Sequence, residues 1–384
     1  MRSAQDDNQF SEELQLQSST DGPLQWTTGL YYLHLSDAYT PIAVSFGGTT
    51  EIPLAPGFFL TNALTDTAQK TDSVAVYGQA TYELPGSNHI TAGARYTYES
   101  KSLTGTQTGI ANGFVALPFG SFDASSNVTK PTWRIAFDHR FSNTVMGYIS
   151  YNRGFKSGGY NLSEPSAAPY QTETLDAYEI GVKTSLLNNR LRVNASGFYY
   201  DYKNMQVTRF LQGSPEVYNG ASAHLYGLDL DAEAAVSDHL TIGLTLEALH
   251  DTFTSFPCAD YFGGGPNLSS PQCSAAGVPE LPYLRSAQGN ELPDAPHYTA
   301  SAYIEYTFNV LGGLSTLHVD DAVNSGYFPD PDNELRQGPF TVLNASWRLN
   351  TRDERYFAQL WAKNLTDRRY AYQLEASNIQ YAES

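Results

Sequence analysis

The segment YNRGFKSGGYNL, residues 151–162, combines an arginine, a lysine and three glycines at the end of a run of alternating residues. A glycine-rich segment with a lysine can cradle a phosphate when it has the pattern GxxxxGK[ST] and a helix behind it, because the helix N-terminus supplies much of the field. Neither the pattern nor a helical period is present here. We therefore expect a strand that ends in a long loop, with the glycines supplying the positive φ values of a sharp exit.

Three acidic residues at alternate positions, Asp229, Asp231 and Glu233, have the side-chain type that binds calcium. Alternate residues of a straight strand are ~7 Å apart, which is too far for all three to bind one ion. The eight histidines are scattered, and the sequence contains neither a GxSxG turn nor an HExxH helix. The sequence therefore predicts no metal site, no cofactor and no catalytic residue, and we do not expect an enzyme.

The composition restricts the partners. The net charge of −18 and the absence of a basic block argue against nucleic acid, because phosphate binding needs a basic face. The 27 tyrosines are typical of a membrane–water interface, but tyrosine is also favoured in the strands of a soluble β-sandwich. Composition alone leaves both classes open.

Alternation with period two runs through almost the whole chain, as in ITAGARYTYES (90–100), PTWRIAFDHRF (131–141) and YGLDLDAEA (226–234). Such segments form strands with one apolar and one wet face. Several exceed ~10 residues, the length that a tilted strand needs to cross a bilayer. No apolar run is long enough for a transmembrane helix. Aromatic residues stand near the strand ends, where a membrane girdle would lie: Tyr96, Tyr98, Trp133, Tyr151, Tyr199, Tyr306 and Trp347.

About fourteen strands are predicted, and the links between them alternate in length. Short links fall at 18–23, 85–87, 141–143, 187–189, 237–238, 309–313 and 350–354. Long links fall at 36–71, 103–129, 155–171, 254–295 and 322–338, and the intermediate link 203–217 is expected to extend its strands. Short turns on one side and long loops on the other predict an all-β, antiparallel up-and-down transmembrane barrel.

An ordered set of segments resembles the TonB-dependent outer-membrane receptors, and most closely the iron-complex receptors among them. Besides YNRGFKSGGYN, the set comprises QFSEELQLQS (9–18), WTTGLYYL (26–33), YGQATYEL (77–84), GARYTYESKS (93–102), EIGVKTSLL (179–187), GFYYDYKNMQV (197–207) and AKNLTDRRYAY (362–372). The resemblance implies a barrel of 22 strands with a plugged lumen. Residues 1–384 would then be a partial barrel of about 14 strands, without the plug domain, the first strands and the closing strand.

The barrel interpretation assigns residues to its two surfaces. The external loops would hold cations and aromatic rings that suit an anionic ferric chelate, although the same side chains could merely shape the loops: Arg153, Lys156, Tyr160, Tyr261, Phe262 and Tyr327. The charged residues expected to face the lumen are Arg95, Glu99, Arg134, Asp138, Glu179, Lys183, Asp229, Asp231, Glu233, Glu305 and Arg348.

The two cysteines, Cys258 and Cys273, fall in one long link that the barrel interpretation places outside the cell. Proteins reach that side through the oxidising periplasm, so a disulfide between them is expected. Two cysteines without a nearby histidine make a poor zinc site.

The resemblance implies an outer-membrane transport receptor for a scarce solute, and the first candidate for that solute is a ferric siderophore. Its partners would be outer-membrane lipids, a small-molecule ligand and, through the missing N-terminal region, the TonB complex; the intact protein would be a monomer. A cobalamin or carbohydrate receptor of the same family and a passive porin-like channel remain alternatives. The transported chelate is cargo and not a cofactor.

Overall fold

The structure is a computed structural model that describes residues 5–19, 22–45, 52–55, 58–111, 115–211, 214–260, 284–310, 312–353, 355–371 and 374. Across these ranges the regular structure is β-strand. None of their segments forms a helix with the length and hydropathy of a membrane span. The fold class is therefore all-β, as the alternation predicts.

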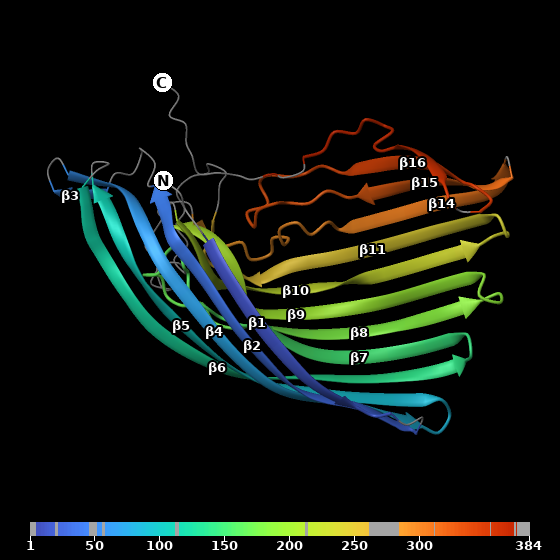
Figure 1. The fold of residues 1–384 in the computed structure, drawn as a ribbon, viewed down its shortest axis with the longest axis horizontal. Helices are drawn as coiled ribbons and strands as arrows, with labels where there is room; N and C mark the ends of the chain where they lie inside the picture. The colour runs from blue at the N-terminus through green and yellow to red at the C-terminus, as the bar shows by residue number, and fades with distance from the viewer. Residues whose placement is uncertain are drawn as a thin grey trace.

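One sheet of fifteen strands contains nearly all of the described secondary structure, and fourteen of its strands follow one another in chain order (Figure 1). Every neighbouring pair on this path is antiparallel, which confirms the predicted up-and-down order. A short strand, β3 (Ile52–Ala55), pairs with β4 outside the path, and a separate hairpin joins β12 (Ala259–Asp260) to β13 (Leu284–Arg285). The fourteen strands are β1 (Gln5–Gln17), β2 (Leu24–Ser45), β4 (Phe58–Leu84), β5 (Asn88–Ala111), β6 (Val115–Ser142), β7 (Val145–Lys156), β8 (Glu173–Leu186), β9 (Leu191–Leu211), β10 (Ser214–Ala235), β11 (Leu240–Ser255), β14 (Tyr298–Val310), β15 (Gly313–Asn324), β16 (Phe340–Asn350) and β17 (Phe357–Ala362).

The short links lie where they were predicted, and Figure 1 shows them gathered at one end of the curved sheet. The turn between β4 and β5 is typical, since Gly86 and Ser87 both have positive φ, at 82° and 61°. Glycine adopts this backbone conformation without steric cost, so the chain can reverse within three residues. The opposite end of the sheet carries the long connections, and we call it the mouth.

Two of the predicted long links, 36–71 and 103–129, are wrong, because most of their described residues belong to strands. β4, β5 and β6 have 27, 24 and 28 residues, so the segments assigned to links 36–71 and 103–129 continue the ladder well past the length a bilayer requires. The segment TDTAQKTDS (65–73) is polar on both faces, a pattern that resembles a loop. It forms a strand because both neighbours supply backbone partners. The link 203–217 extends its strands, as expected.

The sheet has two chemically distinct faces. Large apolar side chains project from one, including Ile149, Ile180 and Leu228, which are more than half exposed. We call this the apolar face and its opposite the polar face. Strand alternation and register place all of the predicted lumen-facing residues on the polar face: Arg95, Glu99, Arg134, Asp138, Glu179, Lys183, Asp229, Asp231, Glu233, Glu305 and Arg348.

Val319 and His318 test this division of faces. Val319 lies mid-strand on the apolar face, opposite Ile304 and Ala345, whereas His318 lies on the polar face, 3.4 Å from a carboxylate oxygen of Glu305. Val319→Arg should destabilise the folded receptor in liposomes by about 2–4 kcal/mol, because a cation would face hydrocarbon near the bilayer midplane. His318→Arg places a cation beside the Glu305 carboxylate on the polar face and should fold normally. The fraction refolded is read from the heat-modifiable band on a gel, and equal tolerance of both variants would contradict the assignment of faces.

Candidate functional site

A segment that we call the strap, residues 157–172, connects β7 to β8 at the mouth and lies against the polar face of β4 and β5. The Thr67 hydroxyl donates to the Leu162 carbonyl at 2.7 Å, and the Tyr160 backbone N–H donates to the Gln69 side chain at 3.0 Å. Ser157 donates to the carboxylate of Glu99. The first half of the strap is therefore fixed to strands that precede it by 58 to 95 residues.

The other attachment of the strap is to β9 and β10. The side chain of Asn161 exchanges two hydrogen bonds with the backbone of Val217, at 2.9 and 2.7 Å. The side chain of Asn219 makes the same kind of double contact with the backbone of Gln171. An amide side chain offers an N–H donor and a carbonyl acceptor, as a peptide group does, so each asparagine replaces a strand partner. The strap thus crosses the polar face between two distant parts of the wall.

The glycines of the opening segment have a different role from the predicted one. Gly158 and Gly159 do not have positive φ. A Cβ at Gly158 would lie 2.2 Å from the Tyr170 carbonyl oxygen, and one at Gly159 would lie 2.6 Å from the Tyr170 hydroxyl. These glycines allow close approach of the two halves of the strap, which meet in a bridge between Gly159 and Tyr170. Burial in this contact raises the pKa of Tyr170, with further contributions from the negative charges of Asp37 and Glu99.

A second segment, residues 284–297, also folds onto the polar face at the mouth, and we call it the cap. Ala287 and Leu292 of the cap are buried with Phe253, Phe256 and Ala223 in one apolar cluster. Backbone hydrogen bonds join the cap to the end of β11, at 2.8 to 2.9 Å, and the carboxylate of the buried Asp251 accepts the backbone N–H of Leu292. The cap is therefore packed against the wall as a folded part of it.

Tyrosine–carboxylate hydrogen bonds recur on the polar face away from the mouth. Tyr77 donates to Glu13 at 2.6 Å, Tyr303 donates to Glu233 at 2.7 Å, and Tyr148 donates to Glu179. Arg95 lies over the ring of Tyr31, 5.0 Å from its centroid. Two of these bonds reach across an intervening strand, from β4 to β1 and from β14 to β10, and the third joins the neighbouring strands β7 and β8. Within the described ranges no three His, Cys, Asp or Glu side chains are grouped to hold a metal ion.

The predicted ligand-binding residues lie in different places. Lys156 is the last residue of β7 and is exposed on the polar face, and Tyr327 is half-buried in the connection between β15 and β16. Tyr160 is in the strap but is buried, at 8% exposure, so it packs there and does not face the mouth. Tyr261 and Phe262 lie outside the described residues.

The prediction that Arg153 lies in an external loop is wrong, because the residue belongs to strand β7. It shares the apolar face with Tyr151, pairs with Asp176 at 2.6 Å and lies 5.0 Å above the ring of Trp133. The strand also enters the predicted link 155–171 by two residues, because Phe155 and Lys156 have partners on β8.

Cys258 is disulfide-bonded. Cys273, its predicted partner, lies outside the described residues. The backbone carbonyl of Cys258 accepts a hydrogen bond from the Tyr218 hydroxyl at 2.6 Å, which ties the start of this link to β10.

The residues that attach the strap were not identified from the sequence: Gln69, Asn161, Gln206 and Asn219. One signal could have found some of them. Gln69 and Gln206 are amide side chains on strand segments that extend past the length a bilayer requires. Side chains at such positions do not line the membrane-spanning part of the wall, so they are available to bind a segment that folds over it.

A family model and several known proteins match most of the chain. The family model described as "TonB dependent receptor-like, beta-barrel" matches residues 2–365. The pesticin receptor of Yersinia enterocolitica is 24% identical over 287 residues, which are 73% of this chain and 37% of that receptor.

Solved structures show the same fold. The ferric yersiniabactin uptake receptor FyuA from Yersinia pestis has a TM-score of 0.73 at 20% identity, over 98% of this chain and 52% of that one. The ferric-catecholate import receptor Fiu from E. coli K12 has a TM-score of 0.65 at 15% identity, over 95% and 51%. The chain thus spans about half the length of these receptors or less. On the family match, the chain belongs to the TonB-dependent receptor-like β-barrels, which are bacterial outer-membrane receptors and not enzymes.

Proposed function

We propose that the full-length protein is an active-transport receptor that takes up a ferric siderophore across the outer membrane. This chain contributes part of the barrel wall, together with the strap and the cap at the mouth. The observation that carries the proposal is that both segments fold onto the polar face, where hydrogen bonds attach the strap to β4 and β10 and the cap to the end of β11. A wide pore with unattached loops would pass small solutes, whereas fixed inward segments narrow the mouth to a binding surface.

The names of the similar receptors support this substrate class. One is a pesticin receptor, one takes up ferric yersiniabactin and one imports ferric catecholates. In the proposal, Lys156 and Tyr327 contact the chelate together with Tyr261 and Phe262, because a cation and aromatic rings suit an anionic, ring-bearing ligand. The chelate is cargo, and no resident cofactor is needed.

The same proposal places the remaining parts of the receptor outside this chain. A plug domain would fill the lumen and contact the polar face, and it would receive energy from the inner membrane through TonB. The receptor would act as a monomer, with the apolar face in contact with lipid all around. Residues 1–384 would be a partial barrel within it.

Uptake through the mouth is tested in the full-length receptor by replacing Lys156, Tyr261, Phe262 and Tyr327 together with alanine. The half-saturating concentration of ferric yersiniabactin should rise roughly tenfold or more, the size of one lost charge-assisted contact. The readout is radioactive iron uptake in iron-limited cells. The matched control replaces Lys203 and Tyr298, a lysine and a tyrosine of the apolar face, and should leave uptake unchanged. Equal uptake by both variants would remove the four residues as ligands.

The dependence of uptake on TonB distinguishes an active-transport receptor from a passive channel. Uptake should disappear in cells that lack TonB. Persistent uptake there would identify a passive channel, and TonB-dependent uptake of cobalamin or an oligosaccharide with no response to ferric siderophores would identify a different receptor of the same family.

The strap is tested separately with Asn161→Ala, which removes both hydrogen bonds to the backbone of Val217. Docking of the strap should weaken by roughly 2 kcal/mol, because each bond contributes about 1 kcal/mol. Hydrogen–deuterium exchange of peptides from residues 157–172 of the full-length receptor in nanodiscs should rise accordingly. Ser163→Ala is the control, since its hydroxyl makes one long contact, 3.4 Å from the carbonyl oxygen of Pro215. Unchanged exchange in Asn161→Ala would show that these contacts do not hold the strap.

A further inference from the structure

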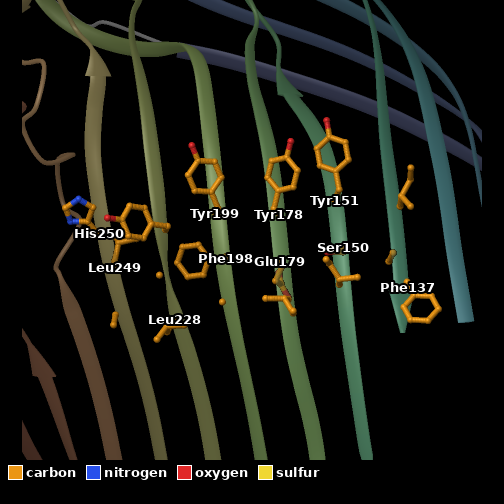
Figure 2. Close-up of a pocket in the computed structure, with 18 residues that line it drawn as sticks. Phe137, Ser150, Tyr151, Tyr178, Glu179, Phe198, Tyr199, Leu228, Leu249 and His250 are labelled. Carbon is orange, nitrogen blue, oxygen red and sulfur yellow. The ribbon is translucent and has the colours of Figure 1, made fainter. Parts of the chain in front are cut away.

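A groove of about 830 Å³ lies on the apolar face, where strands β6 to β11 run side by side (Figure 2). It is separate from the mouth and from the polar face, so the transport proposal gives it no role. Its lining is almost wholly hydrocarbon and aromatic.

The floor of the groove is made by Gly197 on β9. In register with it stand Ile180 on β8 and Leu228 on β10, whose side chains are 63% and 65% exposed. Gly197 leaves a slot between these two ridges, which are two strand spacings apart, about 9.5 Å between backbones. The slot continues one step further from the mouth, because Ala195 is again small between Val182 and Leu230.

The end of the groove nearest the mouth is aromatic. Figure 2 shows the rings of Tyr151, Tyr178 and Tyr199 side by side, with their hydroxyls pointing in the same direction along the strands, away from Phe137 and Leu228. Tyr151 and Tyr178 are stacked, with centroids 4.7 Å apart. The hydroxyl of Tyr151 donates to Asp176 at 2.8 Å, so the rings separate the hydrocarbon slot from a polar rim.

The rim carries charges of both signs. Arg153 pairs with Asp176 at 2.6 Å, and Lys203 pairs with Asp201 at 2.9 Å, while His224 lies beside Asp201. Along β9, the apolar face therefore runs from charge through tyrosine to glycine and alanine within nine residues. A lipid has the same order, from a charged head group to an acyl chain.

We propose that this groove binds one acyl chain of an outer-leaflet membrane lipid, with the head group at the charged rim. The apolar face is the lipid-contacting surface of this barrel family, and the groove is continuous with it. On a convex wall an acyl chain is contacted from one side. In the slot, Ile180, Leu228 and the floor contact it from three, which increases the dispersion contacts of every methylene group.

Gly197→Ile fills the slot and is the test variant. A Cβ at Gly197 would meet Leu228 at 3.4 Å and Ile180 at 3.9 Å, which are ordinary contacts, so the backbone accepts a β-carbon there and the rest of the isoleucine occupies the slot. The full-length receptor is purified in detergent and titrated with lipid A, and in parallel with a phosphatidylethanolamine, and the bound lipid is counted by native mass spectrometry. Affinity should fall about tenfold, the change expected when two methylene groups lose their burial.

Gly78→Ile is the matched control, because Gly78 lies on the apolar face of β4 and its Cβ would also meet only ordinary contacts, the nearest at 3.6 Å. It should bind lipid like the parent protein. The heat-modifiable band verifies folding of each variant, and Gly197→Ala, with one methyl group in the slot, should fall between the parent and Gly197→Ile. Weaker binding of lipid A in Gly197→Ile alone supports the proposal, whereas a loss confined to phosphatidylethanolamine would contradict the outer-leaflet assignment. Equal binding by the parent and Gly197→Ile, or binding of neither lipid by the parent, would overturn it.

Discussion

Backbone hydrogen bonding between sequence neighbours is the constraint on which the rest of this structure depends. A strand in hydrocarbon has no water to satisfy its N–H and C=O groups, so each must find a partner in the next strand. In this chain each strand of the main path pairs with the strand that precedes or follows it on that path. This pairing fixes the register, and the register separates an apolar from a polar face. The tyrosine–carboxylate bonds, the strap and the groove all occupy positions that this separation assigns.

The same constraint explains how much of the fold could be predicted. Alternation in segments such as ITAGARYTYES reports directly on which face each side chain takes, so the faces of Arg95 and Glu99 follow from the sequence. The length of β4, in contrast, does not follow from the sequence. The segment TDTAQKTDS is polar on both sides, and it extends the sheet because β2 and β5 continue beside it. That information lies in the partners and not in the segment.

The candidate site was less predictable for a related reason. Its attachments join residues separated by about 50 to 95 positions, through amide side chains that resemble any other solvent-exposed polar residue in the sequence. The glycine-rich composition indicated where the strap begins, but the role predicted for its glycines was wrong. Glycine is favoured both where φ is positive and where two segments approach closely, so the sequence does not distinguish the two roles. Arg153 was misplaced since a charged residue beside glycines suggests a loop, whereas its partners Asp176 and Trp133 stand on neighbouring strands.

The strap also has a consequence for the order of assembly. Contacts within the sheet are between consecutive hairpins, so the wall can grow one strand at a time with little loop-closure entropy at each step. The strap is different, because it joins Gln69 of β4 to Val217 and Asn219 of β10, which are about 150 residues apart in the chain. Both of its attachments can be made only when the strands between β4 and β10 have paired. The closure of the mouth by the strap is therefore a property of the assembled wall and not of any single hairpin.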